Sequence, residues 1–178
     1  LRLRLRARPR RLDSRWLYDA RGSELFEEIT RVPEYYPTRA ETEILARHAS
    51  EIRQICGSST LVELGSGSST KTRLLLDAWC AFPGAHYAPV DTCAAALAEA
   101  ATGLRKTFPS LEITGVHGGF EDIFPRLAAF SPATVAFLGS TIGNFEDPGL
   151  DEFLAGLATN LRAGDHFLLG IDLVKSPV

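Results

Sequence analysis

Methionine is absent from all 178 residues, including position 1, and only three cysteines and two tryptophans are present. Because the chain lacks a starting methionine, we expect it to be a piece of a longer protein. It also lacks any run of about 18 uninterrupted apolar residues, which excludes an ordinary membrane-spanning helix. With 45% hydrophobic residues, its composition is typical of one globular domain.

Cysteine and histidine give no sign of a disulfide framework or a metal site. Cys56, Cys80 and Cys93 are odd in number, far apart and without a C-x-x-C pair, which favours a reducing compartment. The four histidines lack metal-ligand spacing. We therefore predict a cytoplasmic protein without a metal centre.

Charge is distributed unevenly, although the net charge is only −3. Residues 1–15 contain seven arginines and one aspartate, so the remaining chain is acidic. The arginine-rich stretch lacks the interleaved aromatic residues of a base-binding surface and the apolar core of a secretory signal. We interpret it as a solvated basic leader. An acidic body repels phosphates, so we predict no nucleic-acid partner.

Hydrophobic periodicity predicts helices first and then alternating strands and helices. Helices are expected at 22–30 and at about 38–55, the second opened by a capping box of Thr38 and Glu41. Expected strands are 61–64, 86–90, 111–116, 133–138 and 166–171. Expected helices between them are 69–81, 93–107, 121–129 and 148–162, the last capped by Asp147 ahead of Pro148. This alternation predicts an α/β fold with a doubly wound, mainly parallel sheet.

The strand at 61–64 runs into a glycine turn, Gly65-Ser66-Gly67, and then into a helix. Glycine lets a backbone approach a ligand closely, and a helix start presents free N–H groups. Asp91 ends the next strand about 26 residues later, where an acidic residue commonly holds ribose hydroxyls. These features predict a nucleoside ligand, although such a turn is also common without any ligand.

Two departures separate this turn from a dinucleotide fingerprint. Thr70 stands where the third glycine of G-x-G-x-x-G belongs, and Glu63 would repel a pyrophosphate. A carboxylate suits a cationic ligand better, so the pattern favours S-adenosylmethionine over NAD.

A second loop, Gly139-Ser140-Thr141-Ile142-Gly143-Asn144, follows the strand at 133–138. In doubly wound sheets ligands bind at the carboxyl ends of the strands, so this loop should meet the glycine turn and Asp91. An isolated asparagine is also a common turn former, and spacing alone leaves both roles of Asn144 open.

Several blocks of sequence resemble one family in the same order. They are Tyr18-Asp19-Ala20-Arg21-Gly22-Ser23, the run from Ile29 to Glu41, the Glu63 turn, and Phe137 to Asn144. Together they resemble the histidine Nα-methyltransferases of ergothioneine biosynthesis, from about Trp16 to Lys175. The resemblance implies a Rossmann-like methyltransferase fold and S-adenosyl-L-methionine as cofactor.

For the cofactor, the resemblance implies Gly65 in the turn, Lys71 near the methionine part, Asp91 on the ribose, and the pair Gly119 and Phe120 at the adenine. Without the resemblance, Lys71 could equally be a solvated lysine and Phe120 a core residue. The family has an acidic residue where this chain has Gly119, which removes a hydrogen-bond acceptor for the adenine amine.

For the amino-acid substrate, the resemblance implies Tyr35 and Asn144, with Tyr18 and Phe26 lining the pocket. Asn144 would hold the α-amine and the carboxylate. Tyr35 alone could equally be a packed aromatic residue. Methyl transfer to an amine requires positioning rather than a catalytic triad, and we predict no catalytic side chain.

The domain prediction is a basic leader at 1–15, a helical segment at 16–57 that contributes to the substrate pocket, and a cofactor-binding domain at 58–178. Relatives continue with further strands, so the C-terminal strands are expected to be missing here. The full-length protein is expected to be a monomer.

The predicted function is methylation of the α-amine of an amino acid, most directly L-histidine. One alternative is a truncated or degenerate nucleoside-binding domain without catalysis, favoured by Gly119 and by the chain ending at Val178. Another is an NAD-dependent oxidoreductase, which the missing third glycine and Glu63 disfavour.

Overall fold

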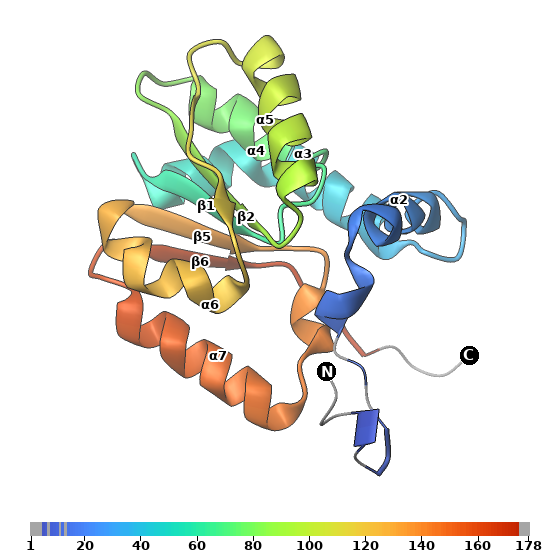
Figure 1. Cartoon of the computed structure of the whole chain (residues 1–178). Coiled ribbons are helices and arrows are strands. Elements are labelled where there is room, and N and C mark those ends of the chain that lie inside the picture. Colours follow the sequence, from blue (N-terminus) through green and yellow to red (C-terminus); the bar gives the residue numbers. More distant parts are fainter. Residues whose placement is uncertain (1–4, 7, 11, 13, 175–178) are drawn as a thin grey trace.

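A six-stranded sheet forms the centre of the computed structural model, which describes residues 5, 6, 8–10, 12 and 14–174 (Figure 1). Its strands are β1 (Thr60–Leu64), β2 (His86–Asp91), β3 (Glu112–Ile113), β4 (Val116–His117), β5 (Ala133–Phe137) and β6 (His166–Leu169). Their order is β3-β2-β1-β5-β6, with β4 also paired to β2. Every pairing is parallel, which confirms the predicted doubly wound sheet.

The central strands are buried along most of their length because helices cover both faces of the sheet. All five residues of β5 are buried, and four of the five in β1. Leu61 and Tyr87 face one core, whereas Val62 and Ala88 face the other, as the two-residue period of a strand requires.

Helices form a layer on each face, as Figure 1 shows. Helices α3 (Pro37–Cys56), α4 (Thr72–Cys80) and α5 (Ala94–Thr107) contribute to the first core. Helix α6 (Phe120–Ile123), the 3-10 turn η2 (Phe124–Ala129) and helix α7 (Asp147–Asn160) contribute to the second. The remaining elements are α2 (Ala20–Ile29) and the 3-10 turns η1 (Ser14–Leu17) and η3 (Thr141–Asn144).

The sheet has its topological switch point between β1 and β5. From β1 the chain crosses to β2 and α4 covers the first face, whereas from β5 it crosses to β6 and α7 covers the second. The two connections diverge, and sheets of this kind bind ligands at the carboxyl ends of the neighbouring strands between them, a place we call the crevice. The predicted nucleoside site therefore belongs here.

Several predicted elements differ from the structure, and the helix expected at 121–129 is divided into α6 and the 3-10 turn η2. The strand expected at 111–116 is divided into β3 and β4, which pair with opposite ends of β2. The helix expected from residue 69 begins only at Thr72, because Ser69 adopts a left-handed conformation with φ 52°. The expected strand 166–171 ends at Leu169.

The predicted helix caps are wrong. Helix α3 begins at Pro37 after Tyr36, whose side chain makes no capping bond, and Glu41 does not reach back to the helix start. Its carboxylate instead contacts groups on other elements, described below. Helix α7 is capped by Glu146 rather than Asp147, so that prediction is displaced by one residue. Part of the predicted basic leader (residues 1–4, 7, 11 and 13) lies outside the described residues.

Candidate functional site: the crevice at the carboxyl ends of the strands

The glycine turn after β1 is held by the end of β2. Gly65 and Ser66 donate their backbone N–H groups to the Val90 carbonyl, at 2.8 and 3.2 Å. Gly65, Gly67 and Ser69 have φ values of 70°, 49° and 52°, so the backbone enters the left-handed region three times in five residues. Such a conformation favours glycine because it has no Cβ, which explains the two glycines here.

Asp91 braces this turn from the end of β2. Its Oδ2 accepts the backbone N–H of Gly67 at 2.8 Å, and its Oδ1 accepts that of Cys93 at 2.8 Å. An ionised carboxylate has about four acceptor positions, so two bonds leave others for ligand hydroxyls. The predicted ribose residue therefore lies directly beside the predicted turn.

Glu63 lies beneath the turn with 5% of its surface exposed. Thr72 Oγ1 lies 2.7 Å from both carboxylate oxygens, and the Tyr87 hydroxyl donates to Oε2. Ser69 Oγ in turn lies 2.9 Å from the Tyr87 hydroxyl oxygen. The carboxylate of Glu63 is thus hydrogen-bonded to side chains of the protein itself. These contacts do not support the interpretation of Glu63 as a partner of a cationic ligand.

Burial strongly affects the protonation of this cluster. It raises the pKa of Glu63 from 4.5 to about 7, while hydrogen bonds from Tyr87 and Thr72 oppose the rise. Burial and the neighbouring Glu63 also hold the pKa of Tyr87 well above its usual value. The sequence analysis did not find the Thr72 and Tyr87 contacts, because nothing in their spacing marks them.

Lys71, the predicted residue for the methionine part, forms an ion pair with Glu41 of α3. The other oxygen of Glu41 accepts the backbone N–H of Gly139, after β5, at 2.8 Å. The pair thus joins the turn after β1, the loop after β5 and the N-terminal helical segment. Glu41, interpreted from the sequence only as part of a helix cap, therefore lies at the candidate site.

Phe120, the predicted adenine residue, lies between the glycine turn and the second core. Its ring centroid is 5.0 Å from that of Phe137, and a Cβ added to Gly65 would come within 3.3 Å of its ring. Gly119 donates its backbone N–H to Asp122 at 2.7 Å. A side chain at position 119 would begin 3.3 Å from the carboxylate of Glu121.

Three of the four predicted substrate residues form one aromatic cluster. Phe26 of α2 packs edge-on against Tyr18 and Tyr35, with ring centroids 5.8 and 5.9 Å away. Burial, followed by the effects of Tyr18 and Glu41, raises the pKa of the Tyr35 phenol, so the hydroxyl is protonated at neutral pH. Asn144 lies on a separate element, exposed at the end of η3.

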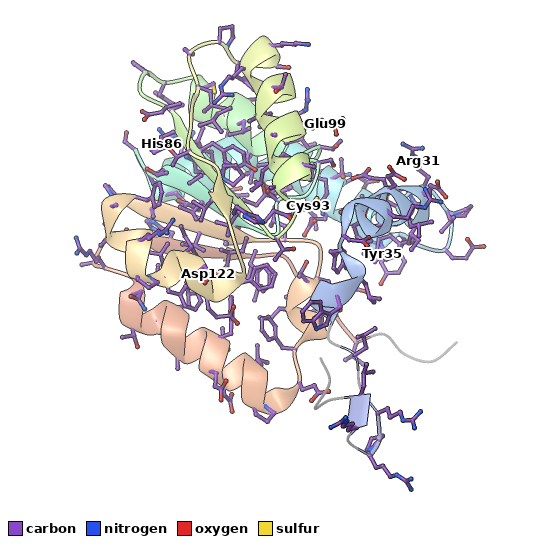
Figure 2. All side chains as sticks on the ribbon, in the orientation of Figure 1. Arg31, Tyr35, His86, Cys93, Glu99 and Asp122 are labelled. Carbon is purple, nitrogen blue, oxygen red and sulfur yellow. The ribbon has the colours of Figure 1, made fainter. Side chains whose placement is uncertain are left out.

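The N-terminal helical segment reaches the crevice at three points. Ser68 in the turn donates to Glu27 of α2 at 2.7 Å, and Glu41 of α3 bonds Lys71. The Tyr36 hydroxyl donates to Asp172, just beyond β6. Figure 2 shows Tyr35 in this segment and Cys93 in the main body. Residues 16–57 therefore contact the carboxyl ends of β1, β5 and β6.

Elsewhere, a cavity of about 110 Å³ lies at the opposite, amino ends of the strands, with Arg53, Ser59 and His86 in its wall. Within the described residues no cluster of three histidine, cysteine or acidic side chains is placed to hold a metal. That part of the chain also contains no helix long and apolar enough to cross a membrane.

A doubly wound parallel sheet, with a glycine turn braced by an acidic residue from the next strand, defines a Rossmann-like, nucleoside-binding class of protein. The family described as "Histidine-specific methyltransferase, SAM-dependent" matches residues 1–178, and the chain belongs to that family.

Individual proteins agree with this assignment. Over 172 residues the chain is 47% identical to the histidine N-alpha-methyltransferase of Mycolicibacterium smegmatis, covering 96% of this chain and 54% of that protein. It is 34% identical to ergothioneine biosynthesis protein 1 of Schizosaccharomyces pombe, covering 90% of this chain and 22% of that protein. It thus spans about half the length of the bacterial relative.

Among solved structures, the CcbJ methyltransferase from Streptomyces caelestis matches with a TM-score of 0.52 and 16% identity. The match covers 70% of this chain and 47% of that chain, and it confirms the fold.

Proposed function

We propose that this chain is the N-terminal and cofactor-binding portion of an S-adenosylmethionine-dependent methyltransferase that acts on the α-amine of L-histidine. The observation that carries the proposal is the hydrogen bond from Gly67 to Asp91 at the carboxyl ends of β1 and β2, with Lys71, paired with Glu41, four residues further along the same turn. This set offers acceptors for ribose hydroxyls and a cation for a carboxylate. The residues present therefore fit the cofactor.

The roles follow from these positions. Gly65 lets the cofactor approach the turn, Asp91 holds the ribose, Lys71 holds the carboxylate of the methionine part, and Gly119 and Phe120 lie at the adenine. Gly119 has no side chain that could accept a hydrogen bond from the adenine amine. The carboxylate of Glu121, which lies near this position, can accept that hydrogen bond instead. Tyr35 and Asn144 bind the amino acid, and Tyr18 and Phe26 line its pocket. We further propose that residues 16–57 form the substrate side and residues 58–178 the cofactor side, preceded by a basic leader.

When bound, the cofactor supplies a methyl group already activated by its sulfonium. The protein's task is to hold the attacking amine in line with that group, and positioning of this kind contributes roughly 7–11 kcal/mol. The amine must be neutral to attack. The reference pKa of a peptide α-amine is roughly 7.7–8.0, and the α-amine of a free amino acid is more basic, so a desolvated pocket or a tyrosine acceptor has to favour the neutral form. A protonated Tyr35 still has oxygen lone pairs that accept a hydrogen bond from the amine.

Calorimetric titration with S-adenosylhomocysteine, with NAD as control, tests the cofactor half. We expect saturable binding of S-adenosylhomocysteine alone, and a loss of roughly tenfold or more in affinity for Asp91→Asn. Asp77→Asn, on the exposed side of α4, is the matched control and should leave the affinity unchanged. NAD binding would favour an oxidoreductase. A folded chain that binds neither would support the degenerate-domain alternative.

The substrate half requires the full-length protein, because relatives are longer than this chain. We expect it to methylate histidine, with loss of activity in Asn144→Ala; turnover of another amino acid but not histidine would overturn the substrate assignment. We also propose that the full-length protein is a cytoplasmic monomer. Its mass in solution, measured by light scattering, tests the oligomeric state.

A further inference from the structure

Glu41 lies in the second turn of α3, but its carboxylate is directed toward the carboxyl ends of the strands rather than toward solvent. It reaches Lys71, the last residue before α4, and the backbone N–H of Gly139, just after β5. Only 14% of the Glu41 side chain and 24% of the Lys71 side chain are exposed. This ion pair is therefore built into the crevice and differs from an exposed surface pair.

Two glycines make room for this carboxylate. A Cβ on Gly170 would stand 2.1 Å from Glu41 Oε1, so any side chain there displaces the carboxylate. Gly139, with φ 74°, turns its backbone N–H onto the same oxygen. Gly170 is itself fixed by backbone hydrogen bonds to Phe137 and Ser140. Glu41 is thus anchored by the ends of β5 and β6, independently of Lys71.

Because one oxygen of Glu41 is held by the backbone of Gly139, the other oxygen can fix the position of the Lys71 ammonium. A lysine ammonium has three donors on a flexible four-carbon stem, and an unrestrained lysine loses much rotamer freedom when it binds a ligand. Glu41 occupies one donor and holds Lys71 Nζ 3.5 Å from where a Cβ on Gly139 would be. The ammonium is therefore fixed at the switch point between β1 and β5, with two donors left.

We propose that Glu41 is a positioning residue that holds Lys71 in place for the carboxylate of the methyl donor's amino-acid end. This inference rests on the proposed function. It implies that helix α3, which belongs to the N-terminal helical segment, contributes to recognition of the cofactor as well as of the substrate. Glu41 acts through Lys71, so its effect is confined to ligands that carry that carboxylate.

The test compares two nucleosides that differ only in the amino-acid end. S-adenosylhomocysteine carries the carboxylate and the amine, whereas 5′-methylthioadenosine lacks both. We expect Glu41→Gln to weaken S-adenosylhomocysteine roughly tenfold and 5′-methylthioadenosine less than twofold. The matched control is Glu43→Gln, an exposed glutamate of the same helix that pairs with Arg47, and it should change neither affinity.

Equal weakening of both nucleosides in Glu41→Gln would overturn the inference, because a purely structural role affects the whole site. Unchanged affinities would overturn it as well. If Glu41→Gln does not fold, Glu41→Asp keeps the charge but is too short to reach both partners, and the same selective loss is expected. If the unsubstituted chain binds S-adenosylhomocysteine, the cofactor half of the proposed function stands whatever the variants do. If the folded, unsubstituted chain binds neither nucleoside, the proposed function and this inference both fail.

A double substitution identifies the route of the effect. Lys71→Met alone should weaken S-adenosylhomocysteine, and adding Glu41→Gln to it should cause less than a twofold further loss. Additive losses would show that the two residues act independently. That result would also overturn the inference.

Discussion

At the scale of single residues, the site depends on backbone conformations that few side chains tolerate. Gly65 combines a left-handed φ of 70° with the Phe120 ring at 3.3 Å from its missing Cβ. Gly84 has a similar φ of 75°, but nothing lies within 4 Å of its missing Cβ. The two positions separate the cost of the conformation from the cost of the contact.

We expect both Gly65→Ala and Gly84→Ala to lower the free energy of unfolding by roughly 1–2 kcal/mol, the ordinary cost of a left-handed alanine. Only Gly65→Ala should also weaken S-adenosylhomocysteine, because its methyl group displaces Phe120 or the turn. Chemical denaturation and calorimetry measure the two effects. Equal affinities in both variants would show that the turn does not approach the ligand.

Glu63 predicts a pH dependence of stability with a definite sign. Because burial raises its pKa from 4.5 to about 7, the folded state keeps a proton that the unfolded chain releases between those values. The stabilisation is therefore complete below pH 4.5 and is lost as the pH rises through 7. Its size is on the order of 3 kcal/mol. Tyr87, Thr72 and Lys71 oppose the pKa rise, and Glu41 adds to it.

Urea denaturation from pH 5 to 8 checks this prediction. Glu63→Gln should remove most of the loss of stability that the unsubstituted chain shows over that range. Glu99→Gln, an exposed residue of α5, is the control and should leave the pH profile unchanged. A Glu63→Gln profile parallel to that of the unsubstituted chain would assign the pH dependence to other groups.

At the scale of elements, the connection into β6 depends on one carboxylate. Asp165 accepts hydrogen bonds from the Ser131 hydroxyl at 2.8 Å and from the backbone N–H groups of Ala133 and Arg162 at 2.7 and 2.8 Å. Burial alone would raise the pKa of Asp165, but these hydrogen bonds hold it below its usual value. The side chain thereby fixes the starts of β5 and β6 together.

We expect Asp165→Ala to lower the free energy of unfolding by about 1–3 kcal/mol, because it leaves backbone donors without their partner. Since the pKa is depressed, this contribution is present at neutral pH and is lost as the pH falls through the folded value. Asp151→Ala, exposed on α7, is the control. Similar stabilities of the two variants at pH 7 would contradict the prediction.

Element types were predictable from the sequence because short, mainly apolar runs such as Leu61–Leu64 and Ala133–Phe137 are buried on both faces. The boundaries of the elements were less predictable. Nothing in the residue type marks Ser69 as left-handed, since glycine is the usual residue there. The division of the strand near Gly115 depends on its pairing with β2, which local sequence does not reveal.

The residues of the candidate site also differed in how far the sequence could predict them. Gly65 and Asp91 were predictable because their spacing along the chain reflects the pairing of β1 with β2, where Gly65 bonds to Val90 and Gly67 to Asp91. Glu41 was misread because a capping pattern is local, whereas its contact with Lys71 depends on how α3 packs against the sheet. Tyr18, Phe26 and Tyr35 were found only through the family resemblance, and the structure brings them together.

At the scale of the whole molecule, ligand binding and folding are linked. A ligand that binds only the folded chain stabilises it by about 2.7 kcal/mol at 100 times its Kd. For a chain of this size that corresponds to a rise in Tm of roughly 5–11 °C. We expect S-adenosylhomocysteine to produce this rise, NAD to produce none, and Asp91→Asn to reduce it. A thermal scan of the chain with each nucleoside measures the shift, and an equal shift with both would contradict a specific site.

The contact of Glu41 with the loop after β5 also has a consequence for synthesis on the ribosome. Gly139 lies 98 residues after Glu41, and a ribosome adding about 5–20 residues per second needs roughly 5–20 seconds to bridge that distance. Lys71 emerges much earlier, only 30 residues after Glu41. A nascent chain can therefore form α3, β1 and the glycine turn while the carboxylate still lacks its backbone anchor. The end of the crevice that contains Glu41 and Lys71 is completed last, when β5 and β6 have joined the sheet.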